Sequence, residues 1–577
     1  MFGIQKTIFP QQPMITARRH MIVAGHYLAT EAGFKILEAG GNAVDAGVAA
    51  GIALGVVHSD QVQFSGVAPM LIYLKEQNRV VSVAGLGWWP QATSIELFEK
   101  KYRGEIPLGI LRTVVPAAPD AWITVLKKFG TMSFGEVSET AIRYAQDGFT
   151  VHPTMANFLD HYQENYRKWP SNSKIWLKNG LPLKEGDLLV QEDLAKSLKY
   201  MVDEEKSAAR NGRETGLDAA RDAFYKGDIA KTIAEYHETN GGLLTREDLA
   251  EYSTPLEEPL SVRFMDMDIY SCGPWCQGPT LLQMLRILEK IDLHSLGHNS
   301  TEYLHILTET IKLTFADREA FYGDPKLIDV PIKHLLSKEF AAERKAMIDM
   351  NKAWRTMPPA GSIPGFGKPK FLAPEDQSTT GAAPDTSYAC AIDKLGNICS
   401  ITPSDVSFDS PVIPGLGFCP SSRGSQSFAM KGHASEIAAG KRPRLTPNPA
   451  MAISQGKLAM PFGAPGGDTQ PQGMLQVLLN HLVFKMDIQT SIEAPRFSSH
   501  SHPNSFEPHE CKPGRLSLEE GIEQGVGLTL ANLGHDIEWL PPRSDAVAGV
   551  CAISANLKTG LMSGGADPRR SGRAMGW

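Results

Sequence analysis

The sequence predicts an α/β protein in which helices cover a pair of packed sheets. Helical segments rich in small residues precede residue 386, and antiparallel hairpins that alternate with helices follow it. Helices and sheets each have an apolar face to bury, so this order favours sheets packed face to face under helical layers. At 577 residues the chain exceeds the usual size of one domain. It therefore holds several domains or one large fold with more than one layer.

Two helices are expected within residues 28–57, because Gly40, Gly41 and Asn42 form a helix-ending turn in the middle of this stretch. Gly and Ala predominate in the second of these helices, which allows it to pack closely against a flat surface such as a sheet. Apolar periodicity predicts further helices. They cover residues 120–129, 136–147, 280–293 and 473–484. The charged stretch 203–221 is expected to be an exposed helix or loop.

Three hairpins are predicted after residue 386 from pairs of strand-like runs joined by short polar turns. The turns are residues 394–397, 454–457 and 556–559. In the first hairpin, Tyr388, Cys390 and Ile392 alternate with smaller residues, which is typical of a strand with two different faces.

Composition excludes several classes of partner. Apolar residues make up 42% and charged residues 21% of the chain, as in ordinary globular proteins, and the net charge is -7. Without a long basic run, nucleic acid and membrane surfaces are poor partners, so a small-molecule substrate is favoured. The apolar run 46–57 is shorter than the roughly 20 residues of a membrane span. No secretory signal is recognised at the N-terminus, which predicts a cytoplasmic protein.

The seven cysteines are scattered and odd in number, so we expect reduced thiols in the core. Cys272 and Cys276 have no second pair of ligands after them, and a zinc site is not expected there. His500, His502 and His509 gather with Glu507 and Cys511 in one short stretch. That composition is typical of metal sites, but the prolines at 503 and 508 indicate an irregular loop, and no metal or other cofactor is predicted.

Thr386 is the first candidate for chemistry. A segment rich in Pro, Gly and Ser, residues 355–385, ends directly before it, and a core strand begins after it. If the Asp385–Thr386 bond were cleaved, Thr386 would carry a hydroxyl nucleophile and a free α-amino group. The pKa of such an amine is near 8, which suits it to act as the hydroxyl's own base. The alternative is that Thr386 only begins a strand, since Thr favours strands.

A glycine-rich turn, residues 462–468, lies between a predicted strand and a predicted helix. Its successive backbone N–H groups can converge on one point, with the helix dipole behind them, as an oxyanion hole requires. Close packing or a phosphate site would use the same residues. However, the chain contains no phosphate-binding G-x4-G-K-[ST] motif, and Gly85-Leu86-Gly87 lacks the third glycine of a dinucleotide fingerprint.

The chain resembles the γ-glutamyltransferase (γ-glutamyltranspeptidase) family of N-terminal nucleophile hydrolases over nearly its whole length. The matching stretches are ILEAGGNAVDAGVA (36–49), FGTMSFGEV (129–137), YKGDIA (225–230), GGLLTREDLAEY (241–252), FADREAFYGDP (315–325), DTSYACAIDKLGN (385–397), GKRPRLTPNPAMA (440–452), GAPGGDTQPQ (463–472), EAPRF (493–497) and GGADPR (564–569).

This resemblance implies a four-layer αββα sandwich and self-cleavage between Asp385 and Thr386. The expected product is a heterodimer of a helix-rich large fragment, 1–385, and a small fragment, 386–577, which form one folded unit; further oligomerisation stays open. Thr386 matches the family nucleophile. Ser404 falls where the family usually has a second Thr bonded to the nucleophile's amine. Gly466 and Gly467 match the pair whose amides stabilise the oxyanion.

The expected substrate pocket departs from the family pattern. Residues 85–90 lack the Arg that clamps a γ-glutamyl α-carboxylate, and residues 423–428 lack the acidic group that holds its α-ammonium. The Ser pair is replaced by Leu445 and Thr446, and the His after the nucleophile by Tyr388. These departures make the chain similar to the divergent amidohydrolase and acylase branch, because a γ-glutamyl group would lack both charged partners.

Other residues are candidates for a different pocket. Arg423 and Arg444 could form a differently placed anion clamp, and Trp88 and Trp89 an aromatic wall. The alternative for each Arg is a surface or fold-bracing ion pair.

The leading hypothesis is a self-processing amide hydrolase with an acyl-enzyme mechanism on a small amide or acylated amine. One alternative is a γ-glutamyltransferase or glutathione hydrolase with an altered clamp. Another is an uncleaved, non-catalytic binding protein that keeps the fold.

Overall fold

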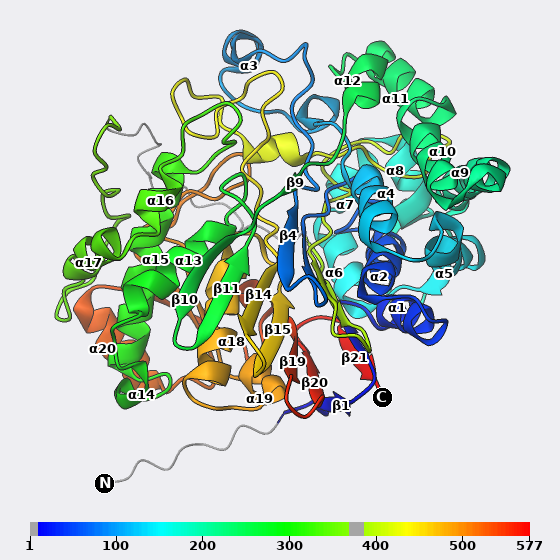
Figure 1. Ribbon diagram of the computed structural model, residues 1–577. Coiled ribbons are helices and arrows are strands. Elements are labelled where there is room, and N and C mark those ends of the chain that lie inside the picture. Colours follow the sequence, from blue (N-terminus) through cyan, green and yellow to red (C-terminus); the bar gives the residue numbers. More distant parts are fainter. Residues whose placement is uncertain (1–9, 368–385) are drawn as a thin grey trace.

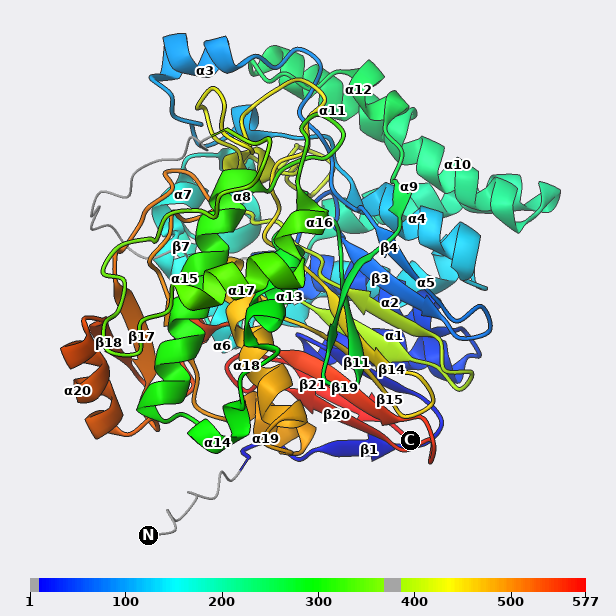
Figure 2. The same cartoon turned by 60° about the vertical axis from the view of Figure 1, so that its left-hand side comes forward.

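The computed structural model describes residues 10–367 and 386–577. Two seven-stranded sheets stack on each other, and helices cover their outer faces (Figures 1 and 2). All strand pairs within these two sheets are antiparallel. The predicted four-layer αββα sandwich is confirmed.

The first sheet has the order β1-β20-β19-β15-β14-β11-β10. Its strands are β1 (Ile15–Ala17), β20 (Met562–Ala566), β19 (Cys551–Asn556), β15 (Leu458–Gly463), β14 (Ala450–Ser454), β11 (Met267–Ser271) and β10 (Leu260–Phe264). The second sheet has the order β21-β2-β12-β13-β3-β4-β9. Its strands are β21 (Arg573–Gly576), β2 (Met21–Ala24), β12 (Ala389–Ile392), β13 (Ile398–Ile401), β3 (Met70–Leu74), β4 (Arg79–Val83) and β9 (Leu256–Glu257). Each sheet combines strands from both sides of residue 386.

Alternating side chains separate the layers. Tyr388, Cys390 and Ile392 belong to the apolar cluster between the sheets, whereas Ala389 and Ala391 pack into the cluster under the helices. This follows from the two-residue period of a strand. The alternation predicted for the 388–392 run is therefore the alternation between an inter-sheet core and a helix-facing core.

The helices over the second sheet include α1 (Tyr27–Glu38), α2 (Ala43–Val57), α4 (Ala118–Phe129), α5 (Phe134–Asp147), α9 (Glu192–Ala208) and α10 (Arg213–Tyr225). Every residue of α2 is buried. A Cβ atom on Gly47 would lie 2.9 Å from Cys399 Sγ, and one on Gly51 would lie 2.6 Å from the Trp122 ring. The small residues of α2 are thus required by its close approach to β13 and α4, as predicted.

The helices over the first sheet include α13 (Gly278–Leu288), α15 (Thr301–Phe321), α18 (Gln470–Leu482) and α19 (Ile488–Glu493). Almost all of α15 is buried, including every charged residue except Glu302. Beside it lies a three-stranded sheet of β16 (Phe497–Ser499), β17 (Arg515–Glu519) and β18 (Asp536–Leu540), covered by α20 (Gln524–Leu533). Neither the buried α15 nor this third sheet was predicted.

Most predicted elements are present. The three hairpins are β12–β13, β14–β15 and β19–β20. The helix expected over 280–293 ends at Leu288, and a separate short helix, α14 (Leu293–Leu296), follows. The charged stretch 203–221 lies within α9 and α10. The segment before Thr386 is described only to residue 367, so its remainder lies outside the described residues.

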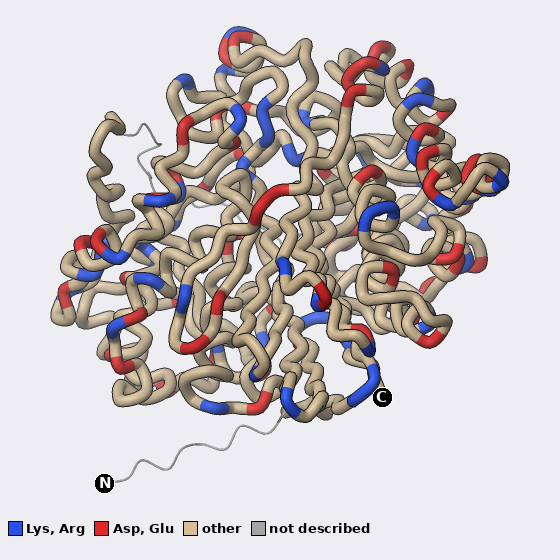
Figure 3. Tube along the Cα trace, in the orientation of Figure 1, with Lys and Arg blue, Asp and Glu red and all other residues tan. Residues whose placement is uncertain are grey.

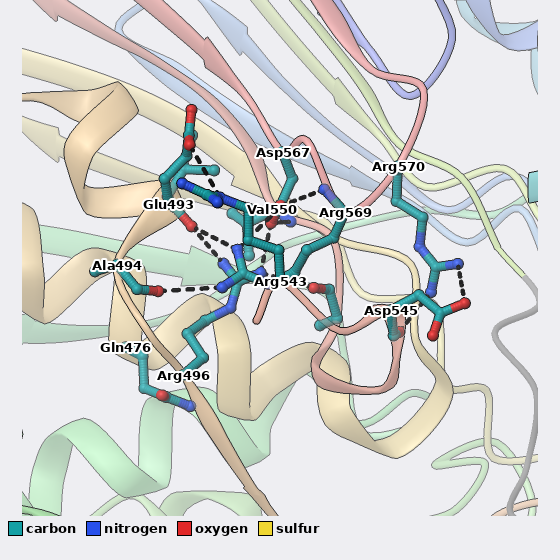
Figure 4. Close-up of polar contacts among 12 residues, drawn as sticks. Gln476, Glu493, Ala494, Arg496, Arg543, Asp545, Val550, Asp567, Arg569 and Arg570 are labelled. Carbon is teal, nitrogen blue, oxygen red and sulfur yellow. Dashed lines mark hydrogen bonds and ion pairs between the residues drawn. The ribbon is translucent and has the colours of Figure 1, made fainter. Parts of the chain in front are cut away.

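Two of the family-like stretches, 493–497 and 564–569, meet in a buried ion network (Figure 4). Asp567 accepts hydrogen bonds from Arg496, from Arg569 at 3.1 Å and from the backbone N–H of Val550 at 3.0 Å. Arg569 also pairs with Glu519. Because the contacts join α19, β17 and the end of β20, this network holds the edge of the first sheet against its helices.

Charged residues of both signs alternate along the outer elements (Figure 3). The seven cysteines are all buried and free, as expected for reduced thiols. Among the described residues, no helix is long and apolar enough to cross a membrane.

Candidate active site

Thr386 precedes β12, with Ser387 and Tyr388 between them, and is buried. It forms an isolated β-bridge with Ser404, which forms a second bridge with Val67. The backbone N–H of Ser387 donates to the carbonyl of Pro403 at 3.1 Å. This pairing brings the two hydroxyl groups together, with Thr386 Oγ1 2.8 Å from Ser404 Oγ. The structure therefore places side by side two residues that are 18 positions apart in the sequence.

Gly66 permits this close approach. A Cβ atom at Gly66 would lie 2.2 Å from the carbonyl oxygen of Ser404 and 2.7 Å from Asp405 Cβ. Asp405 itself has a φ of 144°, a conformation that side-chain-bearing residues rarely adopt. The backbone next to Ser404 is thus held in an uncommon geometry directly beside the two hydroxyls.

Arg423 brings a positive charge next to the Thr386–Ser404 pair. It lies on the short helix η3 (Arg423–Gln426) and is buried. Its Nη2 donates to Ser404 Oγ at 2.6 Å, and its guanidinium carbon lies 5.4 Å from the centre of the Phe506 ring. Its Nε is 3.7 Å from Asp405. Although burial raises the pKa of Asp405, Arg423 opposes this shift.

The glycine turn lies between β15 and α18, as predicted. Gly466 and Gly467 have φ values of 124° and 55°, which favour glycine. A Cβ atom at Gly466 would lie 2.9 Å from Ala548 Cα. One end of the Gln470 side-chain amide lies 3.4 Å from Thr386 Oγ1, so the first residue of α18 connects this turn to Thr386.

Gln277 and Arg318 hold the turn from behind. Gln277 Nε2 donates to the carbonyl of Gly467 at 2.8 Å and to that of Thr446 at 2.9 Å. Arg318 Nη1 donates to Gln277 Oε1 at 2.9 Å and forms an ion pair with Asp468. These contacts fix the backbone of the turn, which is the part that would present N–H groups to an oxyanion.

Arg444 lies in the same buried network. Its Nη2 donates to Glu319 at 2.7 Å and its Nη1 to the carbonyl of Arg318 at 3.1 Å. Burial raises the pKa of Glu319, but Arg444 and Arg318 hold it well below its usual value. Thus the structure places Arg444 in the fold-bracing ion pair that was its alternative interpretation. Thr446, by contrast, lies beside the turn, and its hydroxyl accepts from Gln426 at 2.8 Å.

The other predicted pocket residues are not brought together around Thr386 by their described contacts. Trp89 is fully buried and donates from its indole N–H to Ser427 Oγ at 2.9 Å. Trp88 is half-buried, with its ring 4.8 Å from that of Tyr252. Tyr388 lies between the sheets, and its hydroxyl is 2.7 Å from Ser400 Oγ.

A cavity of about 500 Å³ adjoins the glycine turn. Residues 466–469 form one wall, and α6 (Pro153–His161) contributes another. The remaining lining residues are mainly polar and include Gln61, His500, His502, Glu538 and Arg570. The turn therefore faces a space that can hold a small molecule or part of one.

The histidine-rich stretch shows hydrogen bonds typical of a structural loop. His502 bonds to the carbonyls of Pro503 and Ser499, each at 3.2 Å. His509 bonds to the carbonyls of Asn504 and Ser427 at 2.9 and 3.1 Å. In the described part of the chain, this stretch contributes no group of converging metal ligands.

Two other clusters bring ionisable side chains close enough together to share a metal ion. In the first, His26, His58 and His152, burial lowers each pKa, and the Nδ1 atoms of His26 and His152 accept backbone N–H groups at 3.2 and 3.3 Å. Their ring protons therefore lie on Nε2.

The second cluster is a continuous chain of hydrogen bonds. His305 bonds to the carbonyl of Asp349 at 2.8 Å and to His535 at 2.9 Å, and His535 bonds to Lys312 at 3.4 Å. Neither cluster contains Thr386, Ser404 or a residue of the glycine turn.

Gln277, Arg318 and Phe506 were not among the predicted site residues, although Arg318 lies within the matched stretch 315–325. Asp468 and Gln470 lie within the matched stretch 463–472, where a carboxylate and an amide directly after two glycines were the available signal. The roles of Gln277, Arg318 and Phe506 depend on contacts between segments that are distant in the sequence.

The two stacked sheets and their helical layers have the architecture of an N-terminal nucleophile hydrolase. The family described as gamma-glutamyltranspeptidase matches residues 29–577, and the chain belongs to this family. It is 32% identical over 569 residues to an acylase ACY 1 proenzyme of Pseudomonas sp. (strain SE83), with coverage of 96% of this chain and 93% of that protein. It is 30% identical to a glutathione hydrolase proenzyme of Escherichia coli (strain K12), with coverage of 98% and 93%. The crystal structure of cephalosporin acylase from Bacillus halodurans superposes with a TM-score of 0.85 at 26% identity, covering 100% of this chain and 99% of that one.

Proposed function

We propose that this protein is a self-processing amide hydrolase in which Thr386 becomes the N-terminal nucleophile. Cleavage of the Asp385–Thr386 bond gives fragments 1–385 and 386–577, which stay together as a heterodimer. Asp385 lies outside the described residues. The observation that carries the proposal is the position of Thr386 Oγ1, buried at the start of a core strand, 2.8 Å from Ser404 and 3.4 Å from the amide of the residue that begins α18.

The proposed reaction uses few groups. The α-amine of Thr386 takes the hydroxyl proton as Oγ1 attacks the substrate carbonyl, and it then protonates the leaving amine. The N–H groups of Gly466 and Gly467 stabilise the oxyanion, an interaction worth roughly 3–4 kcal/mol per donor in comparable hydrolases. Water then attacks the Thr386 ester and releases the acid. The adjoining cavity supplies room for a small amide or acylated amine.

The departures in the pocket support an amidohydrolase or acylase rather than a γ-glutamyl enzyme. Residues 423–428 contain no carboxylate to bind an α-ammonium, and within this stretch Gln426 bonds to Thr446. Arg423 is the buried cation nearest to the Thr386–Ser404 pair in the contacts described above. Relatives named as acylase proenzymes support this assignment, and those named as glutathione hydrolase proenzymes support the alternative of a γ-glutamyl enzyme with an altered clamp.

The proposal is tested by following the purified full-length chain on a denaturing gel with N-terminal sequencing. We expect two fragments, the smaller beginning at Thr386, and a single uncleaved chain for Thr386→Ala. Thr386→Ser keeps a hydroxyl and is expected to cleave. A single intact band from the wild type would favour the non-catalytic binding protein instead.

A second assay separates the two enzymatic candidates. The cleaved protein is incubated with γ-glutamyl-p-nitroanilide, with and without an acceptor dipeptide, and in parallel with other acyl p-nitroanilides. We expect turnover of the latter. Robust turnover of the γ-glutamyl compound would establish the alternative.

A further inference from the structure

Three polar atoms in a row connect a permanent positive charge to the Thr386 hydroxyl. Arg423 Nη2 lies 2.6 Å from Ser404 Oγ, which lies 2.8 Å from Thr386 Oγ1. All three residues are buried, so these contacts are made in a region of low dielectric where charge-assisted hydrogen bonds are strong.

The direction of the first hydrogen bond is fixed by chemistry. A guanidinium has only donors, so Ser404 Oγ must accept the hydrogen bond from Arg423. A hydroxyl that accepts a charge-assisted hydrogen bond becomes a better donor through its own hydrogen. When Thr386 Oγ1 loses its proton, the hydrogen of Ser404 can therefore stabilise the negative charge that develops there.

Among the described residues, Asp405 is the carboxylate next to Arg423, and it lies farther from the guanidinium than Ser404 does. Asp405 is 3.7 Å from Arg423 Nε, and its carboxylate accepts shorter bonds from Ser421 Oγ at 2.6 Å and from the N–H and hydroxyl of Ser422 at 3.1 and 2.9 Å. The ring of Phe506 covers the guanidinium at 5.4 Å. Asp405 therefore steadies the cation, while the short bond of Arg423 goes to Ser404.

We propose that Arg423 is a positioning residue that acts through Ser404 to stabilise negative charge on Thr386 Oγ1, in self-cleavage as well as in turnover. This inference rests on the proposed role of Thr386 as the nucleophile. In the acyl-transfer step of each reaction a C–O bond forms at Oγ1, the C–N bond breaks, and the Oγ1 proton ends on the leaving nitrogen. Water then attacks the ester, the bond to Oγ1 breaks, and a proton from the water returns to Oγ1. Ser404 and Arg423 keep their protons throughout.

This role differs from that of an anion clamp. A clamp contacts the substrate, so its loss raises KM for acyl groups that carry a carboxylate and leaves self-cleavage unchanged. A residue that acts on Oγ1 affects self-cleavage, in which no external substrate takes part, and lowers kcat for neutral and anionic acyl groups alike. It also affects the amine: a nearby cation favours the neutral form of the Thr386 amine, which is the form that acts as base.

The test is a double-mutant cycle on self-cleavage with Arg423→Gln, Ser404→Ala and the double variant. Loss of a direct oxyanion donor slows comparable hydrolases about 100- to 1,000-fold. We expect Arg423→Gln to slow self-cleavage only about tenfold, because Arg423 acts on Thr386 Oγ1 through Ser404. In a chain that already carries Ser404→Ala, Arg423→Gln should not slow self-cleavage further, because both residues act through the contact between Ser404 and Thr386. Ser404→Thr keeps a hydroxyl, so in a chain with this substitution Arg423→Gln should again slow self-cleavage.

Turnover supplies an independent readout. The acid limb of the pH profile of kcat/KM should move to higher pH in Arg423→Gln, because removal of the cation raises the pKa of the amine. Arg442→Gln is the matched control: Arg442 is equally buried but binds Asp324 and Glu257, so it should lower stability without moving the profile.

The outcomes are distinguishable. If the wild type fails to cleave, or Thr386→Ala still cleaves, the proposed function fails. If those controls behave as expected but Arg423→Gln cleaves as fast as the wild type, or slows equally in both Ser404 backgrounds, the inference about Arg423 is overturned. Should Arg423→Gln not fold, Arg423→Lys in the two Ser404 backgrounds decides the question in the same way.

Discussion

Arg318 and Asp468 form a buried ion pair across 150 residues of sequence, directly behind the Gly466–Gly467 turn. Asp468 also accepts hydrogen bonds from the N–H and hydroxyl of Ser505 at 2.7 and 2.6 Å. Burial raises the pKa of Asp468, but Arg318 and Ser505 hold it below its ordinary value. The turn is thus positioned by charges that lie outside the reacting atoms.

Asp468→Asn should therefore lower activity more than substrate affinity. Neutralising Asp468 leaves the Arg318 charge less compensated and loosens the turn, and a misplacement of about 1 Å can cost about 100-fold in rate. We expect kcat to fall about 10- to 100-fold with little change in KM, and the free energy of unfolding to fall by about 3 kcal/mol. Steady-state kinetics and urea unfolding measure these changes.

A suitable control is Asp266→Asn. Asp266 pairs with Lys457 at 3.2 Å on the surface, and exposed pairs contribute little to stability. An unchanged kcat in Asp468→Asn would show that the ion pair braces the fold without positioning the turn.

Gly466→Ala should abolish activity. Gly456→Ala is the control that separates the steric effect of the added Cβ atom from the backbone cost of a positive φ. Both glycines have positive φ, 124° and 68°, so both substitutions carry a backbone cost of about 1–2 kcal/mol. A Cβ at Gly456 meets nothing within 4 Å, whereas one at Gly466 lies 2.7 Å from Thr469 Oγ1 and 2.9 Å from Ala548 Cα. We expect Gly456→Ala to keep full activity. Equal activity loss in both variants would contradict the steric argument.

Local pattern was sufficient to predict the elements that carry the chemistry. The small residues of α2, the hairpin after Thr386 and the strand–glycine turn–helix sequence around Gly466 each follow from neighbouring residues. The buried α15 could not be predicted from hydrophobic periodicity, because the charged residues between Glu309 and Glu319 are buried and pair both with one another and with other segments.

The contacts of the candidate pocket were less predictable for the same reason. The sequence offers the same two interpretations for Arg423 and Arg444, an anion clamp or a structural ion pair, yet one binds Ser404 and the other Glu319. The neighbouring residues do not identify these partners, because the partners lie on other elements. Family resemblance identified Ser404 and the glycine pair, whereas Gln277 and Arg318 required the three-dimensional arrangement.

Glu507 provides a prediction about pH. Burial raises its pKa to about 7, although Arg112 opposes the shift. The folded chain therefore retains a proton that the unfolded chain releases above the ordinary glutamate pKa of 4.5. This contribution to stability is present below pH 4.5 and is lost as the pH rises through 7.

Glu507→Gln has no carboxyl group at this position, so it should not lose this contribution to stability as the pH rises. Its free energy of unfolding should rise relative to the parent by about 3 kcal/mol between pH 4.5 and pH 8. Urea unfolding of both chains in the uncleaved Thr386→Ala background measures this difference without dissociation of fragments. A difference independent of pH would show that Glu507 titrates normally in the folded chain.

Asp567 tests whether the ion network of Figure 4 serves the fold alone. Its carboxylate lies between Arg496 and Arg569, and all three side chains are fully buried. Asp567→Asn leaves two buried guanidiniums facing a neutral amide, and breaking a buried pair in this way costs about 3–5 kcal/mol. We expect urea unfolding of the chain that carries both Thr386→Ala and Asp567→Asn to show this loss.

In the cleavable chain with Asp567→Asn, active-site titration of the folded fraction should give an unchanged kcat, in contrast to Asp468→Asn. A lower kcat per titrated site would mean that the network also positions residues around Thr386.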